Sequence, residues 1–218
     1  KVELVRVSLK ILENNATIHK HILNALKKGL ESAMKRSVGS VSIEVKNVVK
    51  QAIISSPEYR ELVGGELQAE LGVPESSSRL EQILDIWLAS LNVSRKPVRI
   101  SGSSLSGGFS LFMIREDWSD VLGTSAAQYT TLKGKIIPWL EWLLLAGDQT
   151  IITDYTFSAT VPAGYYSRTG GGGMLDAPQR RWHVPRQYSG TALDNFVTRA
   201  LLGVGEEVQK IMQAEVQK

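Results

Sequence analysis

Apolar residues recur at steps of three and four through most of the first ninety residues, which predicts a succession of amphipathic helices. The longest stripe follows Asn14 and Asn15, whose side chains can cap a helix N-terminus. Its members are Ile18, Ile22, Ala25, Leu26, Gly29, Leu30, Ala33 and Met34. A second stripe at helical spacing starts at Val41, and we expect Gly39, between the two, to break or bend the helix.

Two shorter helices are expected before residue 95. Ser56-Pro57-Glu58 combines a serine cap, a proline at the first helical position and an acid in the first turn, and Gly64-Gly65 ends the helix that it opens. One of the serines at 76–78 is expected to cap the next helix. The apolar side of that helix consists of Leu80, Ile83, Leu84, Trp87, Leu88 and Leu91.

The period changes from helical to two after Pro97. Residues 98–105 and 108–114 predict two strands joined through Ser106-Gly107-Gly108. Because both faces of the second strand carry apolar side chains, we expect it to be central and covered on both sides. Residues 2–11 also alternate, which predicts a half-buried strand before the first helix.

The same two periods predict the remaining elements. They are a short turn or helical piece at 116–122, an apolar helix at 136–146, a strand at 150–161, a returning strand at 181–184 and a terminal helix at 194–217. Thr191 or Asp194 is the expected cap of the terminal helix, and Gly203 and Gly205 are expected to kink it.

These elements predict an α+β fold in one domain over residues 1–218. Residues 1–95 are expected to be mostly helical with an N-terminal strand. Residues 96–218 are expected to form a small antiparallel β-sheet with a long flexible hairpin loop and a C-terminal helix. Gly170, Gly171, Gly172 and Gly173 form the tip of that loop in this interpretation, because glycine accepts positive φ and has no side chain to bury. We therefore expect shortening of the tetraglycine to leave folding intact and to damage assembly.

Composition narrows the classes of function. The chain is 43% hydrophobic and contains no cysteine, so it can form a core but neither disulfides nor thiolate metal sites. Its net charge of +3 fits a soluble protein, or contact with nucleic acid or an acidic partner. The apolar run at 136–146 is shorter than the roughly 20 residues that a membrane-spanning helix needs, so no membrane is expected.

Known reaction centres have no counterpart in the sequence. His19 and His21 lie two residues apart and would point to different sides of a helix, so no metal site is expected. The serines at 103–106 lack the spacing of a nucleophile elbow, and no Gly-Lys-Ser/Thr follows the tetraglycine. We therefore expect no catalytic residue and no cofactor. If the chain were an enzyme after all, Asp154, Tyr155 and His183 would be the cluster to test.

One basic and aromatic constellation remains. It consists of Arg168, Arg180, Arg181, His183 and Arg186, interleaved with Tyr165, Tyr166, Trp182 and Tyr188. Arginine with aromatic residues is typical of protein interfaces and of surfaces that stack nucleic-acid bases. A loop-rich surface around one buried tryptophan is the third interpretation.

Two runs of the sequence resemble neck proteins of tailed phages. The first contains Ser56-Pro57-Glu58-Tyr59, Leu62, Gly64-Gly65-Glu66-Leu67 and Glu70-Leu71-Gly72. The second contains Arg168-Thr169-Gly170, Met174, Trp182, Val184-Pro185, Gly190-Thr191 and Asp194 to Ala200. Over residues 15–215 the layout is similar to that of the tail-completion proteins, which are also called tail-terminator or head-tail joining proteins. The chain is longer than many of them and adds a helix that contains Trp139 and Trp142.

The resemblance implies a virion protein of the neck, assembled in the host cytoplasm as a six-fold or twelve-fold homo-oligomeric ring. Its neighbours would be head connector or adaptor proteins and tail tube or sheath-terminating proteins, with phage DNA passing through the channel. Candidate interface residues are Arg168, Gly170, Gly171, Gly172, Gly173, Trp182, Arg186, Tyr188, Asp194, Asn195, Phe196 and Arg199. Arg180 and Arg181 are candidates for contact with the DNA. The alternative is a sequence-independent DNA-binding protein.

Overall fold

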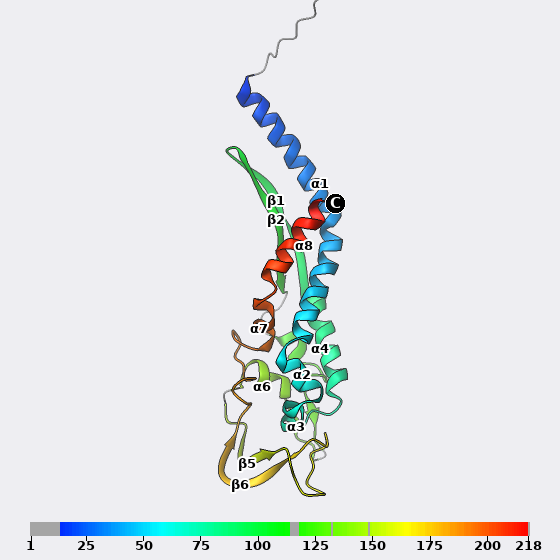
Figure 1. Cartoon of the computed structure of the whole chain (residues 1–218), viewed down its shortest axis with the longest axis vertical. Helices are drawn as coiled ribbons and strands as arrows, with labels where there is room; N and C mark the ends of the chain where they lie inside the picture. Colours follow the sequence, from blue (N-terminus) through cyan, green and yellow to red (C-terminus); the bar gives the residue numbers. More distant parts are fainter. Residues whose placement is uncertain (1–13, 114–117, 132, 148, 218) are drawn as a thin grey trace, which may run out of the picture.

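One long helix organises the molecule. The computed structural model describes residues 14–113, 118–131, 133–147 and 149–217, and it is elongated along helix α1 (Asn15–Ile54) (Figure 1). At about 1.5 Å per residue, the 40 residues of α1 span about 60 Å. Asn14 caps the helix as expected, because its Oδ1 atom accepts a hydrogen bond of 2.8 Å from the backbone N–H of Thr17.

The expected break at Gly39 is wrong, because α1 continues through it. Gly39 is exposed, and no atom lies within 4 Å of the position that a Cβ would take. A glycine inside an exposed helix face costs only about 1 kcal/mol. Burial of Met34, Val41 and Val45 on the opposite side outweighs that cost, since each buried aliphatic side chain contributes about 1.5–3 kcal/mol.

The core lies beside the C-terminal half of α1. The buried side chains that α1 contributes to it are Met34, Val41, Val45, Val49 and Ile53. Three short helices pack there: α2 (Pro57–Gly64), α3 (Glu66–Leu71) and α4 (Ser76–Ser90). Trp87 of α4 contacts the rings of Trp118 and Phe196 edge to face, at 5.7 and 5.9 Å between centroids.

The start of α2 confirms its sequence signal, whereas the start of α4 does not. Ser56 Oγ accepts a hydrogen bond from the backbone N–H of Tyr59, and Gly65 ends the helix. The residue before α4 is Glu75, which has φ of 51° and makes no side-chain cap. Ser76 is buried and its hydroxyl instead accepts a hydrogen bond of 2.7 Å from Gln68 Nε2, so the serine joins α3 to α4.

A two-stranded hairpin follows α4, formed by β1 (Leu91–Ser101) and β2 (Ser104–Met113). The hairpin was predicted, but its turn lies at Gly102, which has φ of 58°, and not at 106–108. Residues 106–108 lie within β2, opposite the irregular register between Lys96 and Arg99. The expectation of a central, covered strand is wrong. In the described part of the chain no third strand pairs with either strand, and Phe112 is 45% exposed.

Short elements complete the far end of the molecule. They are α5 (Ser119–Leu122), β3 (Tyr129–Thr130), β4 (Ile136–Ile137) and α6 (Trp139–Leu144). The predicted helix at 136–146 is shorter than expected, because Pro138 precedes its first turn and Ile136 and Ile137 pair with β3. Strands β5 (Ile152–Ser158) and β6 (Gly173–Trp182) form a third antiparallel pair. The returning strand therefore begins at Gly173, earlier than the predicted 181.

The C-terminal helix is divided as expected into α7 (Phe196–Leu202) and α8 (Gly205–Gln217). Its cap is Asn195 and neither Thr191 nor Asp194. The Asn195 side chain accepts from the N–H groups of Val197 and Thr198, and the Thr198 hydroxyl accepts from the Asn195 N–H, which completes a capping box.

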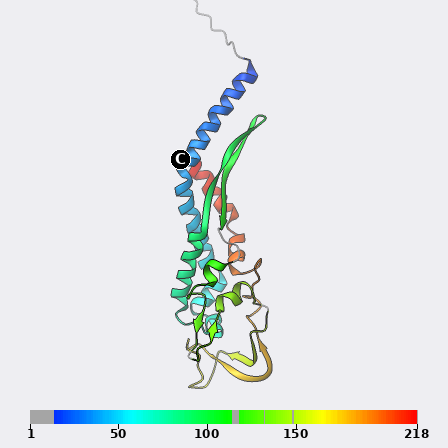
Figure 2. The same cartoon turned by 180° about the vertical axis from the view of Figure 1, so that it is seen from behind.

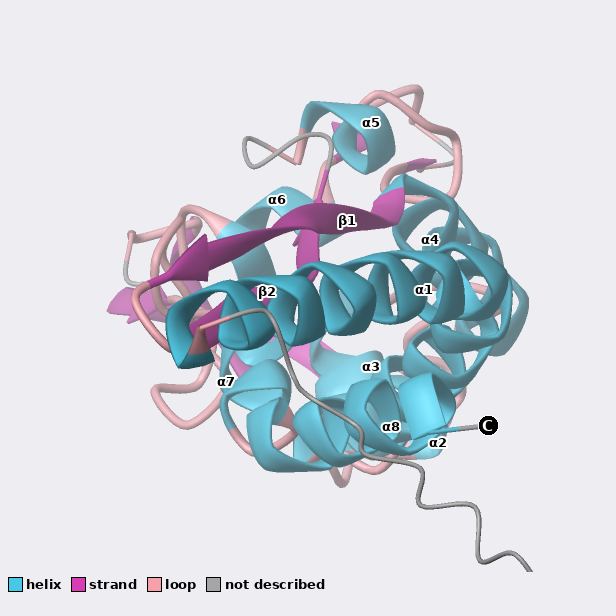
Figure 3. Ribbon diagram, turned by 90° about the horizontal axis from the view of Figure 1, so that it is seen from above, coloured by secondary structure: helices cyan, strands magenta, loops and turns pink. Residues whose placement is uncertain are grey.

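The arrangement is α+β, as predicted, with three separate two-stranded antiparallel sheets among the described residues. Viewed along its axis, α1 lies between the β1–β2 hairpin and α8 (Figure 3), and the hairpin stands away from the short helices (Figure 2). The strand predicted at 2–11 and residues 116–117 of the predicted 116–122 piece lie outside the described residues. Within the described ranges, no helix has both the length and the hydropathy needed to cross a bilayer.

Candidate interaction surfaces

Residues 56–72 and 168–200 meet at an ion pair. Arg199 of α7 donates hydrogen bonds of 2.9 and 3.2 Å to Glu58 Oε1 of α2, from Nη2 and Nε respectively. The Glu58 side chain is 8% exposed and that of Arg199 31%. Arg199 Nη1 also contacts Asp194 Oδ1 at 3.0 Å, at a well-exposed position. Arg199 therefore joins the first and second runs within one chain.

Several predicted interface residues are internal. Asn195 and Phe196 are fully buried, and Trp182 is buried against Trp142, with ring centroids 6.5 Å apart. These three side chains hold the fold of a single chain, so they do not present a surface to a neighbour. Sequence reasoning placed them at an interface because buried anchors and interface anchors share the same composition.

Arg168 holds the loop between β5 and β6 against α3. Its Nε donates a hydrogen bond of 2.9 Å to the carbonyl of Gly72, its Nη2 donates one of 2.6 Å to Tyr129 Oη, and its guanidinium lies 4.3 Å from the centroid of the Tyr129 ring. The Tyr129 hydroxyl in turn donates to the carbonyl of Leu71. Burial raises the pKa of Tyr129, although the positive charge of Arg168 opposes that shift.

The tetraglycine is only partly the open tip that was predicted. Gly170 is exposed with φ of 76°, and nothing lies near its Cβ position. Gly172 and Gly173 are buried, and a Cβ on Gly172 would lie 2.6 Å from the carbonyl oxygen of Ser158. Since Gly173 also pairs with Ser158 at the start of β6, the second half of the tetraglycine belongs to the packed structure. From this packing we expect that shortening the tetraglycine would disturb the fold, contrary to the expectation from the sequence.

Glu70 is a buried carboxyl close to this loop. Burial, and after it the nearby Glu66 carboxylate, raises the pKa of Glu70 to about 7, although a hydrogen bond with Trp182 and the charge of His183 oppose the shift. A carboxyl with this pKa changes its protonation near neutral pH. The sequence offered no signal for it, because Glu70 reads as one of several surface acids.

Two of the three residues considered for catalysis contact backbone groups. Asp154 Oδ1 accepts a hydrogen bond of 2.8 Å from the Gln179 N–H, and His183 Nδ1 lies 2.8 Å from the carbonyl oxygen of Val184. Tyr155 is exposed. Within the described ranges, no group of three or more His, Cys, Asp and Glu residues could hold a metal ion.

Seven of the predicted surface residues are exposed and Tyr188 is half-buried. The exposed residues are Arg168, Gly170, Gly171, Arg180, Arg181, Arg186 and Asp194. Arg180 and Arg181 follow one another on β6, so their side chains point to opposite faces of the strand. They do not form one common basic surface with each other.

The most extensive uncovered surface was not predicted. None of the residues 15–33 of α1, all of which are described, is buried, and Ile22 and Leu26 are 51% and 52% exposed. The hairpin runs beside this half of the helix: residues 100–103 lie next to 15–23, and 95–97 lie next to 31–35. We call residues 15–36 and 95–108 together the arm (Figure 1).

The arm borders an apolar groove. Leu30 and Met34 of α1, Val98 and Phe109 of the hairpin, and Met212 of α8 line a groove of about 570 Å³. Two-stranded hairpins are marginally stable by themselves, and an apolar stripe on a helix is stabilised by covering it. The arm therefore has the properties of a surface that a partner covers.

The arm is also strongly basic. It contains Lys20, Lys27, Lys28, Lys35, Arg36, Arg95, Lys96 and Arg99 but a single acid, Glu31, for a net charge of +7. The salt bridge between Lys27 and Glu31 is the one ion pair within the described residues that involves an arm cation. The net charge of the whole chain is only +3, so the remainder of the chain is acidic.

Comparison of the chain with known protein families, with curated proteins and with solved structures gives no match.

Proposed function

We propose that the chain is a structural subunit of a homo-oligomeric ring, six-fold or twelve-fold, in the neck of a tailed-phage virion. It would assemble in the host cytoplasm between head connector or adaptor proteins and tail tube or sheath-terminating proteins. The observation that carries the assembly role is the arm, which leaves apolar side chains such as Ile22 and Leu26 in water. The assignment to the neck rests on the resemblance of residues 56–72 and 168–200.

The contact between those two runs supports the assignment. Glu58 and Gly72 of the first run bind Arg199 and Arg168 of the second, so residues that carry the resemblance form one connected unit across separations of 141 and 96 positions.

The test is the mass of the protein in solution, measured by light scattering coupled to size-exclusion chromatography. We expect a mass several times the 24.0 kDa of one chain. The double substitution Ile22→Ser with Leu26→Ser should reduce assembly while the far-ultraviolet circular dichroism stays unchanged. The matched control is Leu193→Ser with Leu202→Ser, which removes two apolar side chains that are more exposed but lie outside the arm. A protein that stays monomeric at every concentration and does not join phage particles would contradict the proposal.

The charge of the arm supports a second candidate, a sequence-independent DNA-binding protein. Eight basic side chains with one acid among them would meet the phosphates of a duplex without reading its sequence. This function predicts binding to free duplex DNA whose affinity falls steeply as salt rises. Absence of binding at low salt, measured by fluorescence anisotropy, would exclude it.

A further inference from the structure

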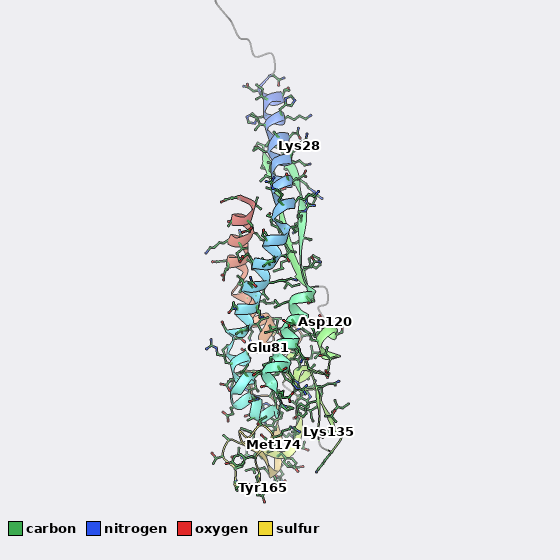
Figure 4. All side chains as sticks on the ribbon, turned by 90° about the vertical axis from the view of Figure 1, so that its right-hand side faces the viewer. Lys28, Glu81, Asp120, Lys135, Tyr165 and Met174 are labelled. Atoms are coloured by element: carbon green, nitrogen blue, oxygen red, sulfur yellow. The ribbon has the colours of Figure 1, made fainter. Side chains whose placement is uncertain are left out.

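One segment that packs on the C-terminal half of α1 is acidic. Residues 56–90, which include α2, α3 and α4, contain seven acids and two bases, for a net charge of −5. We call this segment the base. In Figure 4, Lys28 of the arm and Glu81 of the base lie at different heights along the molecule.

Not every acid of the base is available to a partner. Glu58 is paired internally with Arg199, and Glu70 is half-buried. Four carboxylates remain well exposed, namely Glu66, Glu75, Glu81 and Asp85. The two arginines of this segment make hydrogen bonds within the chain. Arg79 donates to backbone carbonyls of Pro74, Ser125 and Gln128, and Arg60 donates to that of Ser55. The four exposed carboxylates therefore give the base an acidic surface.

The helical part of the arm lies away from the base of the same chain. The base packs on the C-terminal half of α1, whereas residues 15–36 of the arm contain the N-terminal half of the same continuous helix. The basic face of this helix can therefore meet the acidic surface of another copy.

We infer that the arm of one copy lies against the base of the next copy. This inference rests on the proposed self-assembly and names the surfaces that make it. Lys28 and Lys35 are two helical turns apart on one face of α1, and Glu81 and Asp85 are one turn apart on one face of α4. Because two different surfaces meet, the contact is heterologous, and repetition of a heterologous contact closes into a ring when its rotation allows.

A charge-reversal experiment on the full chain tests the inference. The arm variant carries Lys28→Glu with Lys35→Glu, and the base variant carries Glu81→Lys with Asp85→Lys; all four side chains are exposed. Each variant alone places like charges in the contact, so we expect the concentration for half-maximal association to rise about tenfold or more in sedimentation velocity. The chain with all four substitutions restores opposite charges and should assemble like the original.

The matched control is Lys133→Glu with Lys135→Glu, which reverses two exposed lysines outside both surfaces and should leave assembly unchanged. Circular dichroism verifies the fold of each chain. If a double variant does not fold, the single substitution Lys28→Glu or Glu81→Lys replaces it in the experiment. Normal assembly of the arm or base variant, or no recovery in the fourfold variant, would overturn the inference while leaving the proposed ring intact. An original chain that never assembles would overturn both.

Duplex DNA as the occupant of the arm gives a different pattern. The arm variant would then lose DNA binding in fluorescence anisotropy, the base variant would keep it, and both would assemble normally. That result would also overturn the inference.

Discussion

The contribution of a charged residue to the stability of this molecule depends on how deeply its side chain is buried. Glu58 is buried, and its negative charge is compensated by two hydrogen bonds from Arg199. Asp194 binds the same guanidinium at the surface, where water screens the attraction. The same arginine thus makes one contact that the fold needs and one that it does not.

This difference predicts unequal effects of two substitutions. Arg199→Ala leaves the Glu58 carboxylate buried without its partner, so we expect the free energy of unfolding to fall by about 2–4 kcal/mol. Asp194→Asn removes only the exposed contact and should cost less than about 1 kcal/mol. Urea unfolding followed by circular dichroism measures both, and equal losses would show that burial of Glu58 is not what matters.

Glu70 predicts a dependence of stability on pH. Its pKa is raised to about 7 in the folded chain from an ordinary value of 4.5, so folding favours the protonated carboxyl. The protonated Glu70 carboxyl stabilises the folded chain relative to the ionised carboxylate. This stabilisation is complete below pH 4.5 and is lost as pH rises through about 7.

Glu70→Gln keeps a neutral side chain at every pH, so we expect it to raise the melting temperature at pH 8 more than at pH 5. Thermal unfolding at the two pH values measures the effect, and Glu81→Gln, at an exposed position, is the control. An equal shift at both pH values would contradict the burial argument.

At the scale of elements, local signals predicted two of the four expected helix caps and predicted strand pairing poorly. The caps at Asn14 and Ser56 need only the residues that follow them in sequence, and both are confirmed. The extent of β1 and β2 depends instead on which residues face each other across the hairpin, and the turn at Gly102 gave no stronger signal than the glycines at 107 and 108. The apolar alternation of β2 was interpreted as burial on both faces, yet one face stays in solvent.

The loop before β6 predicts two different results for two neighbouring glycines. Gly172→Ala places a methyl group against the Ser158 carbonyl and the Phe157 ring, at φ of 119°, so we expect a loss of about 2–4 kcal/mol or no folding. Gly170→Ala meets open space and should cost about 1–2 kcal/mol for its positive φ alone. Comparison of the two melting temperatures is the measurement, and similar values would mean that the loop is not packed at Gly172.

At the scale of the whole molecule, the class of the fold could be predicted and the candidate site could not. The α+β class depends on the periods of apolar residues, which are local. The arm depends on a helix and a hairpin separated by more than 50 residues that lie beside each other without covering their apolar side chains. No local pattern shows whether an amphipathic stripe is covered, so the sequence interpretation placed the interface near residues 168–199, several of which are core residues.

The absence of a break in α1 has a mechanical consequence. A helix of 40 residues that is capped at its start and anchored in the core along its second half behaves as a stiff strut. If neighbouring subunits bind the free end of this helix, the inclination of the helix sets the centre-to-centre distance between subunits. The bore of such an assembly would then be dictated by a single angle, the inclination of α1 to the axis of symmetry.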